Sequence, residues 1–384
     1  MPSSVKFVQY RPELRNDVLN LTKHLWGPNS SGNAAYLDWK YRDNPNLGWK
    51  SPLIFLALDD GKVIGMRGVH ATRLEADGNE GQVIPCFGDT VVSPEFRGRR
   101  LLTPLTELAI ATLEKMGYHY LLGVSNIPAT YFHLLKLGWK PAVYYMPQQR
   151  FSWRLRWLSR GYRLARRLPI VADWASAIRQ KTSQSRSIMF AKDDGVFADL
   201  DENSASGEPS ISVATDARPE AMADLIRRLG GDGRIRQVRD VPYLDWRYKN
   251  PHADYRFFFH GYPEIRGYVV VHSRRFDNFG GVNLVDWEAT TSDVRRDLLR
   301  AALNWGRFKS VTTWSQGLQD ETLNLLHKEG FRSKNEWEAV KAYRPGILIR
   351  SFSTQNYDES AIVGRRCLFR GDDWDLRMLY SDSF

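Results

Sequence analysis

Cysteine is scarce in this sequence: Cys86 and Cys367 are the only two among 384 residues. Two cysteines are too few for a disulfide framework or a cysteine-based zinc cluster. Long apolar runs are also missing, because the longest, Pro52–Leu58, has the length of a strand and not the roughly 18 residues of a membrane-spanning helix. The first residues show no apolar stretch behind a basic one, as a secretory signal would. We therefore expect a cytoplasmic globular protein without a metal cluster.

Acidic residues are nearly absent from one segment, and this segment carries the net charge of the chain. The formal net charge is +10, and between Arg150 and Arg186 ten Lys or Arg stand against a single acid, Asp173. The remainder of the chain is close to neutral. Basic character confined to one segment argues against a nucleic-acid surface spread over the body, so we expect no nucleic-acid partner.

One motif occurs twice. Tyr36–Pro45 reads YLDWKYRDNP and Tyr243–Pro251 reads YLDWRYKNP. In both copies the motif follows a predicted strand and helix and precedes a predicted hairpin. These elements are Val5–Tyr10, Pro12–Leu25, Ile54–Leu58 and Val63–Val69 in the first copy, and Ile211–Thr215, Pro219–Leu229, Arg256–His260 and Gly267–His272 in the second. The chain is thus predicted to hold two copies of one α+β unit, residues 1–147 and 208–343, with a connecting segment, 148–207, and a strand-like C-terminal extension, 344–384.

The connecting segment starts with an amphipathic pattern from Phe151 to Leu168, which Pro169 ends. Trp and Leu share one face of a helical wheel, and most arginines lie opposite. A helix in the surface of an anionic membrane has this pattern, and so does one that packs on its own protein; a nucleic-acid strip is a third interpretation. The residues expected to contact a membrane are Trp153, Arg156, Trp157, Arg160, Arg163, Leu164 and Arg167. On that interpretation the protein is peripheral on the inner face of the membrane.

A basic turn between a strand and a helix is the best candidate for a ligand site. The strand Asp89–Val92 leads into a turn that contains Arg97, Arg99 and Arg100, and a helix follows with Pro104 in its first turn. Unpaired backbone N–H groups and the positive end of the helix dipole meet at such a point. The turn is therefore predicted to bind an anion, and a diphosphate would keep the three arginines from repelling one another.

Residues 92–102, VSPEFRGRRLL, resemble the loop with which N-acyltransferases of the GNAT superfamily bind the pyrophosphate of coenzyme A. That loop reads Arg/Gln-x-x-Gly-x-Gly/Ala, usually after Val-x-Pro, and this sequence departs from it at Arg100 and Leu102. A second partial match runs from Val124 to Trp139. The resemblance implies a mixed, mostly antiparallel sheet flanked by helices, an acyl-coenzyme A donor or an acyl carrier protein, and no metal. The donor-binding residues that it implies are Val91, Val92, Arg97, Gly98, Arg99, Arg100, Leu101, Leu102, Thr103 and Asn126.

Three residues are candidates for the proton transfers of acyl transfer to an amine, which needs a neutral amine and a protonated leaving thiol. Asp89 could deprotonate the ammonium, and His70 is the alternative base because an imidazole titrates near neutrality. Tyr131 matches by type the tyrosine that often acts as thiolate acid in the family. Each also has a purely structural interpretation, and Asp89 has a counterpart, Asp286, in the other copy.

The second copy lacks the Arg-Gly turn, and Asp293 at the start of its helix would repel a phosphate. We expect it to keep the fold, to bind no nucleotide-type donor and to shape the acceptor site. Trp39 and Trp246 of the repeated motif are expected to pack in the core.

The resemblance predicts an N-acyltransferase with one donor-binding copy. Together with the amphipathic pattern it suggests a lipid amine such as a sphingoid base as acceptor, as in bacterial ceramide synthases. Two alternatives stay open. One is an acetyl-coenzyme A-dependent acetyltransferase that acts on a sugar amine, a peptide or a polysaccharide precursor, and the other is a non-catalytic ligand-binding module.

Overall fold

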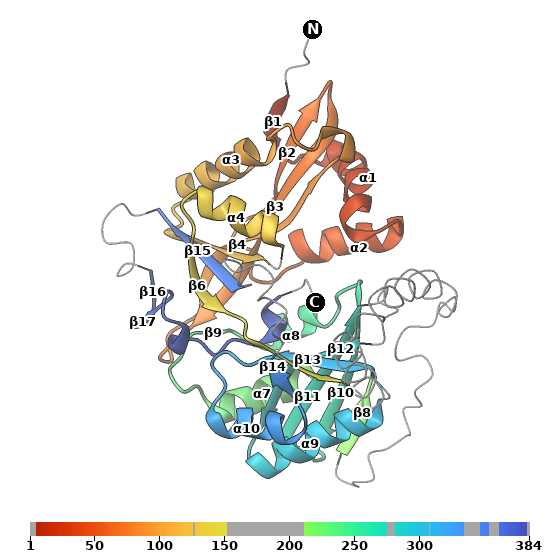
Figure 1. Cartoon of the computed structure of the whole chain (residues 1–384), viewed down its shortest axis with the longest axis vertical. Helices are drawn as coiled ribbons and strands as arrows, with labels where there is room; N and C mark the ends of the chain where they lie inside the picture. The colour runs from red at the N-terminus through yellow and green to blue at the C-terminus, as the bar shows by residue number, and fades with distance from the viewer. Residues whose placement is uncertain are drawn as a thin grey trace, which may run out of the picture.

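The computed structural model describes residues 5–125, 127–151, 211–274, 281–306, 308–333, 346–352 and 361–381. Over these residues the chain forms two domains, one above the other in Figure 1, and each domain has a sheet flanked by helices. No helix of the described part of the chain is long and apolar enough to cross a bilayer.

The first domain is built on an eight-stranded sheet. Its strands are β1 (Lys6–Gln9), β2 (Leu53–Asp59), β3 (Lys62–Glu75), β4 (Gln82–Val92), β5 (Tyr120–Ser125), β6 (Lys140–Tyr144), β9 (Arg236–Gln237) and β15 (Gly346–Ser351). The helices are α1 (Arg15–Trp26), α2 (Ser30–Tyr41), α3 (Leu102–Lys115) and α4 (Pro128–Lys136), with short 3-10 turns η1 (Pro12–Leu14) and η2 (Pro94–Phe96). The strand order is β1-β2-β3-β4-β5-β15-β6, β9 pairs with the end of β3, and only β4 and β5 are parallel.

Alternation in β2 shows how the helices cover both faces of this sheet. Phe55 and the residues two positions before and after it pack under α3 and α4, whereas Ile54 and Leu56 pack under α1 and α2. Both faces are therefore buried, as the nearly continuous apolar run in β2 predicts.

The second domain repeats this arrangement with a seven-stranded sheet. Its strands are β7 (Pro147–Phe151), β8 (Ile211–Ala214), β10 (Ala253–His260), β11 (Gly267–Arg274), β12 (Gly281–Ala289), β13 (Ser310–Trp314) and β14 (Arg332–Ser333). The helices are α7 (Pro219–Leu229), α8 (Val241–Arg247), α9 (Ser292–Trp305) and α10 (Asp320–Lys328). The order is β14-β7-β13-β12-β11-β10-β8, and β12 and β13 are the parallel pair. The predicted α+β fold and its duplication are confirmed.

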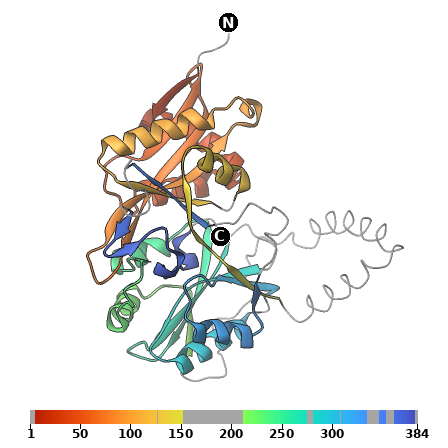
Figure 2. The same cartoon turned by 60° about the vertical axis from the view of Figure 1, so that its left-hand side comes forward.

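The two sheets exchange strands: the first sheet receives β9 and β15, and the second receives β7. β7 follows β6 directly along the chain but pairs with β13 of the second sheet, and β15 inserts between β5 and β6 of the first. Figures 1 and 2 show the blue strand β15 within the red-to-yellow first domain. Residues 148–151 and 346–351, which the sequence assigned to the connecting segment and the C-terminal extension, are therefore strands of the opposite sheets. The amphipathic residues 153–167 lie outside the described residues.

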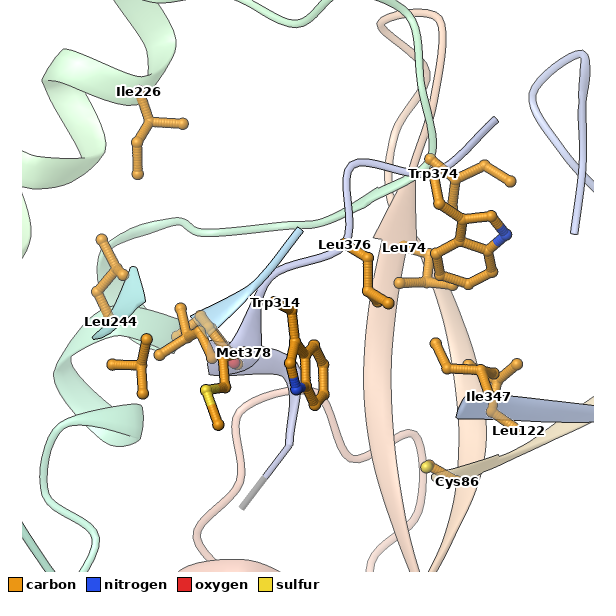
Figure 3. Close-up of a cluster of buried hydrophobic side chains, with 14 of the residues drawn as sticks. Leu74, Cys86, Leu122, Ile226, Leu244, Trp314, Ile347, Trp374, Leu376 and Met378 are labelled. Atoms are coloured by element: carbon orange, nitrogen blue, oxygen red, sulfur yellow. The ribbon is translucent and has the colours of Figure 1, made fainter. Parts of the chain in front are cut away.

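A shared hydrophobic core joins the domains (Figure 3). It combines Leu74, Leu122 and Ile347 of the first sheet with Trp314 of the second, and the C-terminal segment adds the fully buried Trp374. This segment contains the short hairpin β16 (Ile362–Val363) and β17 (Arg366–Cys367) and the 3-10 turns η4 (Gly371–Asp373) and η5 (Met378–Tyr380). The C-terminal extension is thus mostly irregular chain that packs between the domains.

The repeated motif lies at this domain interface. The rings of Trp39 and Trp246 stack with centroids 4.6 Å apart and an interplanar angle of 8°. Trp39 Nε1 donates to the carbonyl of Trp246 at 2.8 Å, and Trp246 Nε1 donates to the carbonyl of Trp39 at 2.7 Å. The two tryptophans, expected as core residues of separate copies, therefore form one symmetrical contact between the copies.

Candidate active site

The parallel strands β4 and β5 separate soon after they meet. They pair only at Cys86–Leu122 and Phe87–Gly123, although β4 continues to Val92. On its other side β4 stays paired with β3, with one extra residue in β4 between the pairs Arg67–Thr90 and Val69–Phe87. Such a bulge increases the local bend. It leaves the end of β4, including Val91 and Val92, without a strand partner on the β5 side among the described residues.

The predicted anion-binding turn follows directly from this strand. Arg97, Gly98, Arg99 and Arg100 are all exposed, and no carboxylate of the described residues pairs with the three arginines. Arg97 Nε donates to the carbonyl of Val92 at 3.4 Å, and the guanidinium of Arg99 lies 4.6 Å from the ring centre of Phe96. The arginines therefore keep their charge available to a ligand.

Helix α3 begins at this turn without a side-chain cap and without an acid in its first turn. The first backbone hydrogen bond of the helix is donated by the N–H of Leu105 to the carbonyl of Leu101. The N–H groups of Leu102 and Thr103 precede it and have no intrahelical acceptor, and Pro104 has no N–H to satisfy. These features fit an anionic group in front of the helix. Leu101 is buried in the core below, and Leu102 and Thr103 are partly exposed.

Arg100 has a φ of +58°. Residue 100 is the place where the resembling loop has glycine, and a left-handed backbone is what glycine supplies without strain. The loop thus keeps the glycine conformation while carrying an arginine, so the departure in sequence is not a departure in backbone shape. Asn126, the last predicted donor residue, lies outside the described residues.

Asp89 sits at the bulge of β4 and is held by three donors. Lys40 Nζ and the Tyr41 hydroxyl donate to Oδ2 at 2.8 and 2.7 Å, and Trp26 Nε1 donates to Oδ1 at 3.2 Å. Lys40 is 2% exposed. Burial, and next the charge of Asp89, raise the pKa of Tyr41 well above its usual value. Asp89 therefore neutralises a buried cation and fixes the end of α2.

Asp286 occupies the same place in the second domain, at the bulge of β12. It accepts from Tyr268 at 2.7 Å, from Arg239 at 2.7 Å and from Tyr248 at 3.3 Å, and its side chain is fully buried. Tyr248 is the last tyrosine of the repeated motif, as Tyr41 is in the first copy. A carboxylate at the bulge, tied to a cation and to the last tyrosine of the motif, is thus common to both copies.

His70 lies on β3 beside this cluster. A Cβ added at Gly88 would come 3.0 Å from His70 Nδ1 and 3.1 Å from Lys40 Nζ, so both nitrogens lie next to Gly88. The imidazole also lines a cavity of about 40 Å³ between the domains. Trp39, Trp246 and Trp374 contribute to its wall. Two of the three predicted catalytic residues, His70 and Asp89, thus both lie beside Lys40.

Tyr131 lies apart from that pair. It is 3% exposed and belongs to the hydrophobic core under α3 and α4. His133, on the same helix, has its Nε2 3.4 Å from the hydroxyl oxygen of Thr106 on α3. Burial, followed by the charges of Arg67 and Lys136, lowers the pKa of His133.

Sequence analysis overlooked a buried arginine at the base of α3. Arg67 of β3 is 1% exposed, donates to the Thr106 hydroxyl at 3.2 Å and has its guanidinium 4.9 Å from the ring centre of Phe87. No carboxylate of the described residues pairs with it, and burial lowers its pKa to about 10. Lys40 and Tyr41 were also missed as site residues. Because these two residues and Asp89 each have a counterpart in the second copy, the sequence repeat could have indicated them.

The equivalent turn of the second domain is much shorter. Only Thr290 and Thr291 connect β12 to α9, and the Thr291 hydroxyl accepts from the N–H of Val294 at 3.3 Å. Asp293 lies at the start of the helix, where a Coulomb repulsion would act on a phosphate. This helix end is therefore already capped, unlike that of α3.

Residues 18–139 match the model of the acetyltransferase (GNAT) family. This part of the chain is similar to a GNAT acetyltransferase domain. Enzymes of this family use an acyl-coenzyme A as donor, and the match supports an N-acyltransferase enzyme. The bulged, separated strands and the loop before α3 all lie within the matched residues. In the described residues no group of three or more His, Cys, Asp or Glu could hold a metal ion.

Solved structures resemble the whole described arrangement. A probable N-acyltransferase from Enterococcus faecalis V583 has a TM-score of 0.57 at 11% identity, over 93% of this chain and 75% of that one. A GCN5-related N-acetyltransferase from Anabaena variabilis ATCC 29413 has a TM-score of 0.54 at 11% identity, over 91% and 73%. A tandem GNAT protein from the clavulanic acid biosynthesis pathway has a TM-score of 0.50 at 11% identity, over 91% and 98%. At this identity the likeness shows the fold, and no curated protein matches the chain.

Proposed function

We propose that the chain transfers a short acyl group from a coenzyme A thioester to an amine, and that the amine approaches between the two domains. The observation that carries this proposal is the exposed turn from Arg97 to Arg100 in front of the uncapped start of α3. Three unpaired guanidinium groups and free helix amides suit a diphosphate. The end of β4 lies beside this turn and has N–H groups that can polarise a thioester carbonyl.

The proposed reaction forms an N–C bond and breaks the C–S bond of the thioester. One proton must leave the amine, and one must reach the departing sulfur. We assign the first role to His70, because its imidazole lines the interdomain cavity and histidine is the side chain that most often transfers protons in enzymes. Asp89 acts as a positioning residue, since both of its oxygens already accept bonds and its charge is matched by Lys40. The role of Tyr131 as thiolate acid stays a prediction, and its burial weighs against it.

The acceptor is proposed to be a compact amine, such as that of an amino sugar or a peptide. The cavity of about 40 Å³ beside His70 and Lys40 has room for an amine group but not for a long alkyl chain, so the rest of the acceptor would lie outside it. A lipid amine such as a sphingoid base, with a ceramide synthase-like reaction, is the second candidate. It is supported by the amphipathic pattern of residues 151–168. Peripheral attachment to the inner face of an anionic membrane and an acyl carrier protein as donor belong to the same candidate.

Calorimetric titration with acetyl- and palmitoyl-coenzyme A tests the donor. We expect saturable binding of acetyl-coenzyme A that is weakened about tenfold or more by Arg97→Ala combined with Arg99→Ala, because each charge-assisted bond contributes about 1.5–3 kcal/mol. Glu107→Ala, at an exposed position further along α3, is the matched surface control. Binding of the palmitoyl form alone would favour the lipid candidate. Binding of neither would remove the donor proposal.

Release of free coenzyme A in the presence of small amines tests the roles of the two residues. His70→Gln is expected to lower kcat about a hundredfold or more, with the melting temperature nearly unchanged. Asp89→Asn should lower both activity and melting temperature, because it leaves Lys40 buried without its counter-charge. A His70→Gln variant with wild-type kcat across the pH range would refute the assignment of the base.

A further inference from the structure

The second domain has its own cavity at the place that corresponds to the separation of β4 and β5 in the first domain. β12 and β13 pair only from Gly281–Ser310 to Asn283–Thr312 and then separate, although β12 continues to Ala289. Past the end of this pairing, a cavity of about 260 Å³ lies between the end of β12 and the segment that follows β13. Its wall includes Trp287 and Glu288 of β12, Arg295 of α9, Thr322 of α10 and the Gly317–Gln319 segment after β13. This is a little below the roughly 300–1,000 Å³ of pockets for drug-sized ligands.

The cavity is closed to a nucleotide-type donor by the capped start of α9. The N–H of Val294 is taken by Thr291, and Asp293 pairs with Arg296 in front of the helix. The pyrophosphate-binding part of the cleft is thus missing, while the inner part persists. A ligand of this cavity has to be compact and needs no nucleotide.

All but one of the arginines that line the cavity form an ion pair with a carboxylate. Arg377 is matched by Asp375 and Glu288, with nitrogen–oxygen distances of 3.2 and 2.9 Å. Arg234 is matched by Asp232, and Arg236 by Glu75 of the first domain. Each carboxylate that lines the cavity is therefore engaged.

Arg295 is the remaining cation. Its Nη1 donates to the Thr322 hydroxyl at 3.0 Å, and no carboxylate of the described residues forms an ion pair with it. Burial lowers the pKa of this guanidinium, which shows that its charge is partly withdrawn from water. Its guanidinium is half-buried in the wall of a polar cavity, and the carboxylates of Glu288, Glu321 and Asp375 act on it only from beyond ion-pair distance, so an anion that enters the cavity would stabilise it.

We propose that the second domain binds a compact organic or inorganic anion, a carboxylate or a phosphate, between β12 and β13, with Arg295 as its anchor. Thr322 orients the guanidinium, and the C-terminal segment closes the cavity through Asp375 and Arg377. The second domain is then a ligand-binding unit in its own right. This inference does not depend on the reaction proposed for the first domain.

Thermal unfolding of the full chain in the presence of succinate, citrate or inorganic phosphate tests the proposal, with sodium chloride at equal ionic strength as reference. We expect at least one of the three anions to raise the melting temperature with a saturable dose dependence. Arg295→Met should weaken this effect about tenfold or more. Arg300→Met removes an exposed arginine of the same helix, which pairs with Glu329, and should leave the effect intact.

Two results would overturn the inference. One is an equal stabilisation of the wild type and Arg295→Met, which would mean that the anion acts on the surface in general. The other is the absence of a saturable effect with all three anions. Binding of acetyl-coenzyme A to Arg295→Met, measured in parallel, separates failure of this site from failure of the proposed donor site. Loss of both in Arg295→Met would indicate misfolding, and Thr322→Val then repeats the test with a smaller change; unweakened anion binding in that variant would also count against the site.

Discussion

The left-handed backbone at Arg100 allows a sharp test of the loop. Replacing Arg100 by Ala or by Gly removes the same guanidinium, but only Gly relieves the strain of a φ of +58°. A non-glycine residue in this region costs about 1–2 kcal/mol, and the extra freedom of Gly in the unfolded chain takes back about 0.4–1 kcal/mol. Arg100→Gly is therefore expected to be about 1 kcal/mol more stable than Arg100→Ala, measured by urea unfolding of the two variants side by side.

Donor binding completes this test. Both variants lose the same charge and should bind acetyl-coenzyme A with similar, weaker affinity than the wild type and with a smaller dependence on salt. The comparison of Gly with Ala thus isolates the backbone, and the comparison of either with the wild type isolates the charge. Equal stability of the two variants would refute the left-handed conformation at residue 100. Unchanged donor affinity in both would refute a role of the Arg100 side chain.

Three further predictions concern the interface, the exchanged strands and pH. Trp246→Ala should destabilise the chain by about 3 kcal/mol and lower the calorimetric melting temperature, because it removes the stacked ring and the hydrogen bond from Trp246 Nε1 to the carbonyl of Trp39; an unshifted transition would contradict this. A fragment of residues 1–151 should not give the dispersed amide spectrum of a folded domain, because it lacks β15. For His133, whose pKa lies below its ordinary 6.5, the unfolded chain takes up a proton first as pH falls, so stability is retained above pH 6.5 and declines below it. His133→Gln should reduce that decline in melting temperature, and an identical pH dependence in the variant would show that other groups cause it.

The duplication and the exposed basic turn before α3 could be predicted from sequence because their signals are local. The motif around Trp39 recurs around Trp246, and the turn before α3 combines a strand end, arginines and a helix start within a dozen residues. Such patterns depend on neighbours along the chain.

The exchanged strands and the buried Arg67 could not be predicted in this way. β15 pairs with the edges of β5 and β6, which lie far from it in sequence, so its neighbours along the chain do not indicate this pairing. In β3, a register shift opposite Leu58 breaks the simple alternation, so Ile64 and Arg67, three residues apart, both face α3 and α4. Counting every second residue from the start of the strand therefore misplaces the arginine.

The register of β15 has a consequence for how the protein is made. Residue 346 pairs with residue 125, so the first sheet is completed only after residue 346 has left the ribosome. Contacts this distant in sequence slow folding, and an open sheet edge between β5 and β6 persists meanwhile. During synthesis, the sheet of the first domain therefore cannot be completed before the second domain has been made. A chain that ends before residue 346 is expected to leave the basic turn before α3 on an incomplete sheet.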